Sequence, residues 1–181
     1  VQYVGKSEAH HVKDRIVNKM LKKHLVDFST IIFIFLIDRV SKLLIISSPE
    51  TYEQYGISIT SFLNFNLIWN EGIAFGLFSF DEKFYYNLLT IIICIVILII
   101  IWLMLKSKGF EKISFLLIIG GSLGNIYDRF YYSAVPDFID IHFNNYHWFI
   151  FNVADIFITL GIVFLICIEI FGSKKQKNEN Y

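Results

Sequence analysis

The sequence has few charged residues, few prolines and few cysteines. Only 18% of its 181 residues are Asp, Glu, Lys or Arg, whereas a soluble domain carries about 25%. This shortage excludes a disordered chain, a nucleic-acid-binding domain and an ordinary soluble enzyme. Two prolines argue against a linker-rich protein. The two cysteines, Cys94 and Cys167, lie inside apolar runs without metal-ligand spacing, so we expect both to be core residues.

Long apolar runs dominate what is present. Hydrophobic residues make up 55% of the chain and aromatic residues 18%. The clearest run, 88–105, has Thr90 as its one polar residue and would be about 27 Å long as a helix, close to the thickness of a bilayer core. Three similar runs contain polar residues. The sequence predicts an all-α polytopic membrane protein with four transmembrane helices, at about 25–46, 84–105, 113–130 and 152–171.

Basic residues are unevenly distributed. Twelve of the 16 Lys and Arg residues lie in 1–24, in 106–112 or after 172. Residues 47–87 contain one lysine and five acidic residues. Because basic residues favour the cytoplasmic side, we expect both termini to be cytoplasmic and two loops, 47–83 and 131–151, to face outward.

Three parts of the chain differ in composition. Residues 1–19 lack a core pattern and precede Met20, so we interpret them as an N-terminal extension, either a leader or a cloning scar. Residues 20–172 form a single membrane domain, and 173–181 a basic cytoplasmic tail. Within the first outward loop, residues 51–80 alternate polar and β-favouring side chains, which predicts a small β-rich cradle at the extracytoplasmic surface.

Several polar residues fall inside apolar runs, where a charge costs about 2.5–3.5 kcal/mol or more. Asp38 and Lys42 have the spacing of an intrahelical ion pair. Gly120 and Gly124 form a small-xxx-small face that allows close helix packing. We interpret Asp128 and the adjacent Arg129 as a structural ion pair at the outer interface.

Other chemistries have weaker support. Residues 120–124 fit the G-x-S-x-G pattern of serine hydrolases, but that pattern needs a strand-to-helix turn and a nearby histidine. Ser122 is therefore a weak nucleophile candidate, and Ser41 and Lys42 are adjacent and diverge on a helix. Asp140, His142 and His147 make a weak candidate metal site. An intramembrane serine hydrolase using Ser122 and a small transporter subunit remain the alternatives.

Two carboxylates stand out at the outer boundary. Asp137 lies in the second outward loop, and Asp155 follows the expected start of the fourth helix. Asn152 and Asp155 have the spacing of a helix cap with an acid at its third position. A cap does not exclude chemistry, because a helix N-terminus also favours an ionised carboxylate.

Five segments, taken in order, resemble one family, lipoprotein signal peptidase, also called signal peptidase II. They are D-R-V-S-K at 38–42, N-E-G-I-A-F at 70–75, G-G-S-L-G-N-I-Y-D-R at 120–129, V-P-D-F at 135–138 and F-N-V-A-D at 151–155. The resemblance covers about residues 20–172. Arg39 departs from it, since the family often has Gln there, which leaves the first motif looser but touches no proposed catalytic group.

The resemblance implies an intramembrane aspartyl endopeptidase that cleaves diacylglyceryl-modified prolipoproteins just before the lipidated cysteine. By motif position, Asp137 and Asp155 would be catalytic. The substrate-binding or supporting positions would be Asn70, Gly72, Asn125, Arg129, Asn152, Asp38, Lys42 and Asp128. Loop 51–80 would be the family's β-cradle.

The resemblance also sets expectations for location and partners. We expect a multi-pass protein of the bacterial cytoplasmic (inner) membrane, with its active site near the extracytoplasmic face. Its partners would be lipid-modified prolipoprotein signal peptides and membrane lipid, with no nucleic acid, and it would act as a monomer without metal or organic cofactor. We expect the two aspartates to share one proton, with Asp155 more often ionised.

Overall fold

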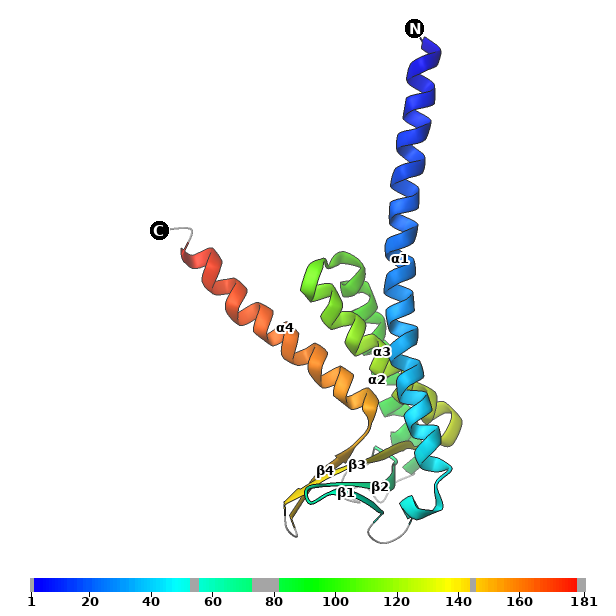
Figure 1. The fold of residues 1–181 in the computed structure, drawn as a ribbon, viewed down its shortest axis with the longest axis vertical. Helices are drawn as coiled ribbons and strands as arrows, with labels where there is room; N and C mark the ends of the chain where they lie inside the picture. Colours follow the sequence, from blue (N-terminus) through cyan, green and yellow to red (C-terminus); the bar gives the residue numbers. More distant parts are fainter. Residues whose placement is uncertain (1, 53–55, 73–81, 144–145, 179–181) are drawn as a thin grey trace.

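Four α-helices make up most of the described part of the chain, which in this computed structural model is residues 2–52, 56–72, 82–143 and 146–178 (Figure 1). They are α1 (Gln2–Ile46), α2 (Glu82–Lys106), α3 (Gly109–Tyr132) and α4 (Val153–Asn178). Each predicted apolar run is helical, to within one residue at the start of α4. Residues 2–24 continue α1, so the described part of the predicted N-terminal extension belongs to the first helix.

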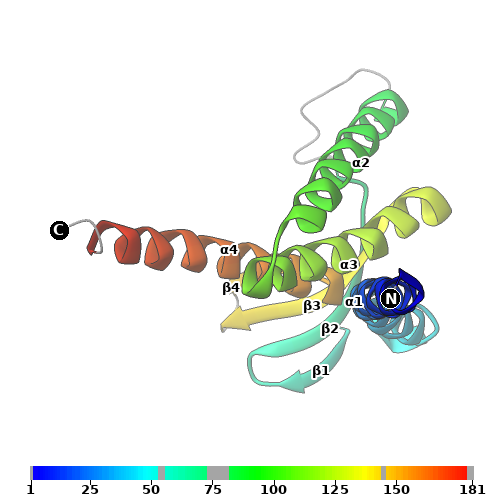
Figure 2. The same cartoon turned by 90° about the horizontal axis from the view of Figure 1, so that it is seen from above.

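The helices are arranged around α3, which packs against α1, α2 and α4 (Figure 2). Glycines permit the closest approaches. A Cβ on Gly120 would lie 2.8 Å from the Cβ of Ile34 in α1, and one on Gly121 would lie 2.5 Å from the carbonyl oxygen of Ala154 in α4. Gly124 faces Asp38, one turn along α1 from Ile34. The predicted small-residue face of α3 is confirmed, and it packs on α1.

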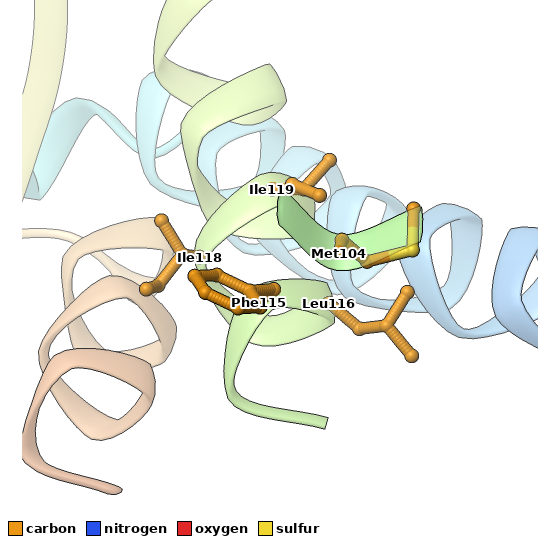
Figure 3. Close-up of a cluster of buried hydrophobic side chains, with 5 residues drawn as sticks. All are labelled: Met104, Phe115, Leu116, Ile118 and Ile119. Carbon is orange, nitrogen blue, oxygen red and sulfur yellow. The ribbon is translucent and has the colours of Figure 1, made fainter. Parts of the chain in front are cut away.

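An apolar cluster fills the contact between α2 and α3 (Figure 3). It consists of Met104 from α2 and four buried residues of α3, namely Phe115, Leu116, Ile118 and Ile119. Burying an aliphatic or aromatic side chain stabilises a water-soluble fold by about 1.5–3 kcal/mol, whereas inside a bilayer close packing provides most of the gain. The cluster holds the hairpin of α2 and α3 together.

A four-stranded antiparallel sheet lies at one end of the helices (Figure 1). Its strands are β1 (Ile57–Thr60), β2 (Leu63–Asn70), β3 (Val135–Phe143) and β4 (Tyr146–Phe151), in the spatial order β1-β2-β3-β4. A short 3-10 helix, Pro49–Tyr52, leads from α1 towards the sheet. The first residues of α1 and the last residues of α4 lie at the opposite end of the molecule.

The sheet was predicted only in part. The expected strands in 51–80 are present as β1 and β2, and residues 53–55 and 73–80 of that loop lie outside the described residues. The second loop that was predicted to face outward, 131–151, is not a plain loop, because it contains the end of α3 and the strands β3 and β4. The fold is therefore mostly helical with a small antiparallel sheet, rather than all-α.

A second apolar cluster fixes the sheet to the helices. Ile45 at the end of α1, Leu67 of β2 and Phe138 of β3 are buried against one another. The rings of Phe65 and Phe138 add an edge-to-face contact at 5.8 Å, a favoured aromatic geometry. Because Phe138 follows Asp137 directly, this cluster fixes the strand that carries the first candidate carboxylate.

Two of the described helices are long and apolar enough to cross a membrane by length and composition, Phe84–Lys106 and Val153–Phe171. Both agree with predicted spans to within one residue. The apolar stretches of α1 and α3 contain more charged residues, among them Asp38, Arg39 and Lys42 in α1.

Candidate active site

A buried ionic cluster joins α1 to α3. Lys42 Nζ lies 2.9 Å from a carboxylate oxygen of Asp38 and 2.6 Å from one of Asp128, and all three side chains are inaccessible to solvent. Arg39 bonds both carboxylates, at 3.1 Å to Asp38 and 2.5 Å to Asp128. Two carboxylates and two cations balance, which reduces the cost of burying each charge.

The cluster confirms one predicted ion pair and corrects another. Asp38 and Lys42 pair within α1, as their spacing predicted. Asp128 does not pair with its neighbour Arg129, but with Arg39 and Lys42. Successive helix residues point about 100° apart, so Asp128 faces α1 while Arg129 points elsewhere. Arg39, the residue that departs from the family pattern, adds two ion pairs to the cluster.

The cluster continues into α4 and towards Asp155. Asp38 accepts a hydrogen bond of 2.9 Å from the backbone N–H of Ala154, in the first turn of α4, where N–H groups have no partner within the helix. Lys42 donates to Asn125 Oδ1 at 2.8 Å, and Asn125 Nδ2 donates to Asp155 at 2.8 Å. The position of Asp155 is therefore fixed through two side chains from the buried charges.

Asp155 also caps α4 together with Asn152. The Asn152 N–H donates to Asp155 Oδ2 at 3.1 Å, and the Asp155 N–H donates to Asn152 Oδ1 at 3.1 Å. This reciprocal pair is the capping box that the spacing predicted. Asp155 therefore accepts hydrogen bonds from Asn125 and Asn152 at the N-terminal end of α4, which is the positive end of the helix dipole.

Asp137 lies on β3, with only 4% of its surface exposed, and is held by two amides. Asn70 Nδ2, at the end of β2, donates to Asp137 Oδ2 at 2.9 Å, and Asn152 Nδ2 donates to Asp137 Oδ1 at 2.5 Å. The Gly72 N–H donates to Asn70 Oδ1 at 2.7 Å, which orients the Asn70 amide with its NH₂ group towards Asp137. Gly72 adopts φ of 75°, a conformation that glycine adopts without strain.

Asn152 is thus shared by the two candidate carboxylates. Its side-chain NH₂ group donates to Asp137, while its backbone N–H and side-chain oxygen bond Asp155. Asn152 is fully buried and joins β4 to α4, which follow one another directly (Figure 1). The chain turn between strand and helix therefore brings the two aspartates together.

The surroundings of Asp137 favour its protonated form. Burial raises the pKa of Asp137 to about 6, and the nearby Asp155 carboxylate adds to the rise, whereas the hydrogen bonds from Asn70 and Asn152 oppose it. A carboxyl group with this pKa exchanges protons close to neutral pH, which suits a general acid or base.

Both aspartates line a cavity of about 500 Å³. Its walls are mostly apolar and come from β4 and the first turns of α4. Besides Asn70, Asp137 and Asp155, the lining residues are Phe149, Ile150, Phe151, Ile156, Thr159 and Leu160. A mostly apolar cavity with two converging carboxyl groups fits an apolar chain that presents one polar bond for reaction.

Sequence reasoning missed the cavity walls. None of Phe149, Ile156 and Leu160 was a candidate, because each is one more apolar residue in a hydrophobic segment. The available signal was position, since all three lie within eight residues of Asn152 on either side. Arg129, a supporting candidate, donates to the Asn125 carbonyl oxygen at 3.2 Å and, within the described residues, makes no hydrogen bond to Asp137 or Asp155.

Ser122 lacks the setting that a serine nucleophile requires. It lies in the middle of α3 and is buried, so it is not at the strand-to-helix turn of a nucleophile elbow. The outward histidines, His142 and His147, belong to β3 and β4. Of the four charged residues that would line a transport path, Asp38, Lys42 and Asp128 pair with one another inside the bundle, whereas Arg129 bonds the Asn125 carbonyl oxygen.

Comparison with known proteins gives a consistent result. Residues 30–171 match the family model of signal peptidase II. A protein named lipoprotein signal peptidase from Pelagibacter ubique is 50% identical over 164 residues, which is 90% of this chain and 99% of that protein. One of the same name from Francisella tularensis subsp. novicida is 40% identical over 87% of this chain and 99% of its own length.

Solved structures share the fold. A bacterial membrane enzyme determined at 2.3 Å is 26% identical and superposes with a TM-score of 0.68 over 83% of this chain and 90% of its own. Another, determined at 1.9 Å, is 28% identical with a TM-score of 0.65, over 78% and 90% of the two chains. The chain therefore belongs to the signal peptidase II family of peptidases.

Proposed function

We propose that this protein is an intramembrane aspartyl endopeptidase that removes the signal peptide from diacylglyceryl-modified prolipoproteins, cutting just before the lipidated cysteine. Its family relatives are named for lipoprotein signal peptides. The main support for an aspartyl mechanism is the position of the two carboxyl groups. Asn152 bonds both Asp137 and Asp155, and both aspartates line one cavity.

The two carboxyl groups have different surroundings, which supports different roles. Asp155 accepts N–H donors at a helix N-terminus, and we assign it the role of the base. It takes a proton from water as the water oxygen bonds the scissile carbonyl carbon. Asp137 with its pKa near 6 gives its proton to the carbonyl oxygen. When the C–N bond breaks, Asp155 returns its proton to the leaving nitrogen, and Asp137 recovers its own as the new carboxyl group forms.

The cavity walls suit a signal peptide. Such a segment is apolar, and in a membrane its helical backbone bonds are satisfied internally. Phe149, Ile156 and Leu160 offer apolar contacts, while Asn70 and the two aspartates can receive backbone groups freed when the peptide unwinds. The diacylglyceryl chains can remain in the surrounding lipid.

We further propose that all four helices cross the inner membrane, with both termini cytoplasmic and the sheet on the extracytoplasmic side. The charges inside α1 and α3 are paired with one another, which lowers their cost in lipid. Apolar side chains are exposed along α2, including Ile91, Ile95 and Leu98, as expected of a surface in contact with lipid. The single domain 20–172 and the tail 173–181 are part of the same proposal.

The test is cleavage of a diacylglyceryl-modified prolipoprotein by purified protein in detergent, followed by gel shift. Asp137→Asn and Asp155→Asn each remove a proton-transfer group, so each should slow cleavage at least about 100-fold. Ser122→Ala is the matched control and should cut like wild type. If either aspartate variant, shown to be folded, kept its activity, the aspartyl mechanism would be wrong; loss on Ser122→Ala would favour the serine alternative.

A further inference from the structure

A second cluster of ligating side chains lies on the sheet, in a part that the proposed reaction does not use. Asp140 and His142 belong to β3, and His147 belongs to β4. His142 and His147 are register partners across the two strands. One ligand atom from each of the three side chains lies within 4.8 Å of the others. These strand ends lie away from the helices (Figure 1).

The charges and hydrogen bonds of this cluster are incompletely satisfied by protein. Asp140 is 1% exposed, and among the described residues its hydrogen-bond partner is His147 Nδ1, at 2.8 and 3.1 Å from the two carboxylate oxygens. His142 Nδ1 is buried and has no hydrogen-bond partner among the described residues. A buried nitrogen without a hydrogen-bond partner is unfavourable, because it has given up its bonds to water and gained none in return.

The same features suit a metal ion. Imidazole nitrogens and a carboxylate are ligands of Zn²⁺, and sites with three protein ligands keep a fourth position for water. At metal–ligand distances of about 2.0–2.1 Å, tetrahedral ligand atoms lie about 3.3 Å apart. The 2.8–3.1 Å contacts of Asp140 with His147 would widen slightly, and ligand atoms as far apart as 4.8 Å would move closer together. His147 is more than half exposed, which leaves its ring free to adjust and the open position accessible to water.

We propose that Asp140, His142 and His147 bind one Zn²⁺ ion. The ion would bond the unpaired His142 nitrogen, balance the buried Asp140 carboxylate and clamp β3 to β4. These strands also carry Asp137 and the cavity residues 149–151. The site is thus structural, outside the proposed proton transfers, and it does not depend on the peptidase proposal.

The experiment is titration of the metal-free full-length protein in detergent with Zn²⁺, followed by calorimetry, and with Co²⁺, whose visible absorption reports tetrahedral nitrogen and oxygen ligands. Wild type should bind one equivalent. His142→Gln and His147→Gln should each weaken binding at least tenfold, since loss of even an outer partner of a metal ligand weakens binding about 10–100-fold.

Controls separate this site from other binding groups. His24→Gln tests a histidine elsewhere on the chain, and Asp155→Asn tests the candidate catalytic carboxylates; both should bind Zn²⁺ like wild type. No binding by wild type, or equal binding by the His142 and His147 variants, would overturn the proposal and leave a hydrogen-bonded His–Asp pair. Because binding is measured without substrate, failure here is distinct from failure of the peptidase proposal.

Discussion

Asn152 shows how one side chain can keep two carboxyl groups close without adding charge. Its amide donates to Asp137 and accepts from the Asp155 backbone at the same time, a combination that neither Asp nor Lys provides. An acid there would place a third negative charge between the two aspartates. A lysine would pair with both carboxylates and favour their ionised forms, removing the shared proton that the proposed mechanism needs.

The raised pKa of Asp137 predicts a pH-dependent stability. In the unfolded chain a carboxyl of this kind titrates near 3.9, and in the folded protein near 6. Protonated Asp137 therefore stabilises the fold at low pH, and this contribution is lost as the pH rises from about 4 to about 6. Relative to Asp137→Asn, the free energy of unfolding of wild type should fall by about 3 kcal/mol as the pH rises across that window.

The measurement is the free energy of unfolding of wild type and Asp137→Asn, at pH 4 and at pH 7, in the same detergent. The prediction concerns how the difference in free energy of unfolding between wild type and Asp137→Asn changes from pH 4 to pH 7. A difference at a single pH does not test it, because the substitution also alters the hydrogen bonds from Asn70 and Asn152 at every pH. Glu50→Gln, at an exposed carboxylate beside the sheet, is the control. A difference that does not change with pH would contradict a raised pKa.

At the residue scale, sequence motifs identified the candidate carboxylates and their supporting positions, but not how residues distant in sequence pair with one another. Asn152 and Asp155 were predicted to form a cap because their spacing is local. Asp128 was misassigned to Arg129 because its true partner Lys42 is 86 residues away in sequence, and no local spacing reveals such a pair. The link from Lys42 to Asn125 to Asp155 was missed for the same reason.

At the scale of elements, the contact between α3 and α4 positions the candidate site. Gly121 of α3 lies against the backbone of Ala154, the neighbour of Asp155, with room for no more than a hydrogen. In Gly121→Ala the added methyl group would push on a backbone oxygen, which cannot rotate away as a side-chain end can. We expect the fold to be destabilised by about 1–3 kcal/mol.

The same change should also reduce activity, because displacing a reacting group by about 1 Å can slow a reaction about 100-fold. The readouts are the cleavage rate and the unfolding midpoint in detergent. Ser122→Ala, at the next position on α3, adds no atom and should leave both unchanged. If Gly121→Ala cleaved substrate at the wild-type rate, the contact between α3 and α4 would not determine the position of Asp155.

The strands β3 and β4 were not predicted, although a signal for them exists. Residues 139–143 alternate Ile, Asp, Ile, His and Phe, and 146–151 are mostly aromatic or β-branched, both typical of strands. The signal was obscured because Asp137 and Asp140 are buried, whereas acids in a strand normally indicate its exposed face. Their burial reflects the candidate site and the His–Asp cluster, which are tertiary features.

At the scale of the whole molecule, the charges within the helices balance across α1 and α3. Asp38, Arg39, Lys42 and Asp128 form one group near the sheet. Lys112 pairs with Asp27 nearer the other end of the helices. The sequence could locate these charges and predict the pair of Asp38 with Lys42, but not the pairs between α1 and α3. The charged residues lower the mean hydropathy of both helices. Hydropathy identifies two helices that could cross a membrane, in α2 and α4. Because the charges of α1 and α3 are paired, it is physically reasonable that these two helices cross it as well.

The proposed orientation predicts which surfaces a water-soluble reagent reaches from outside the cell. Ser58 on β1 and Lys108 between α2 and α3 are both exposed, and the proposal places them on opposite sides of the membrane. In a background with Cys94 and Cys167 changed to Ala, Ser58→Cys should react with an impermeant maleimide in intact spheroplasts. Lys108→Cys should react only after the membrane is opened. The reverse pattern would invert the orientation, and outside labelling of both would mean that α2, which lies between the two positions, does not cross the bilayer.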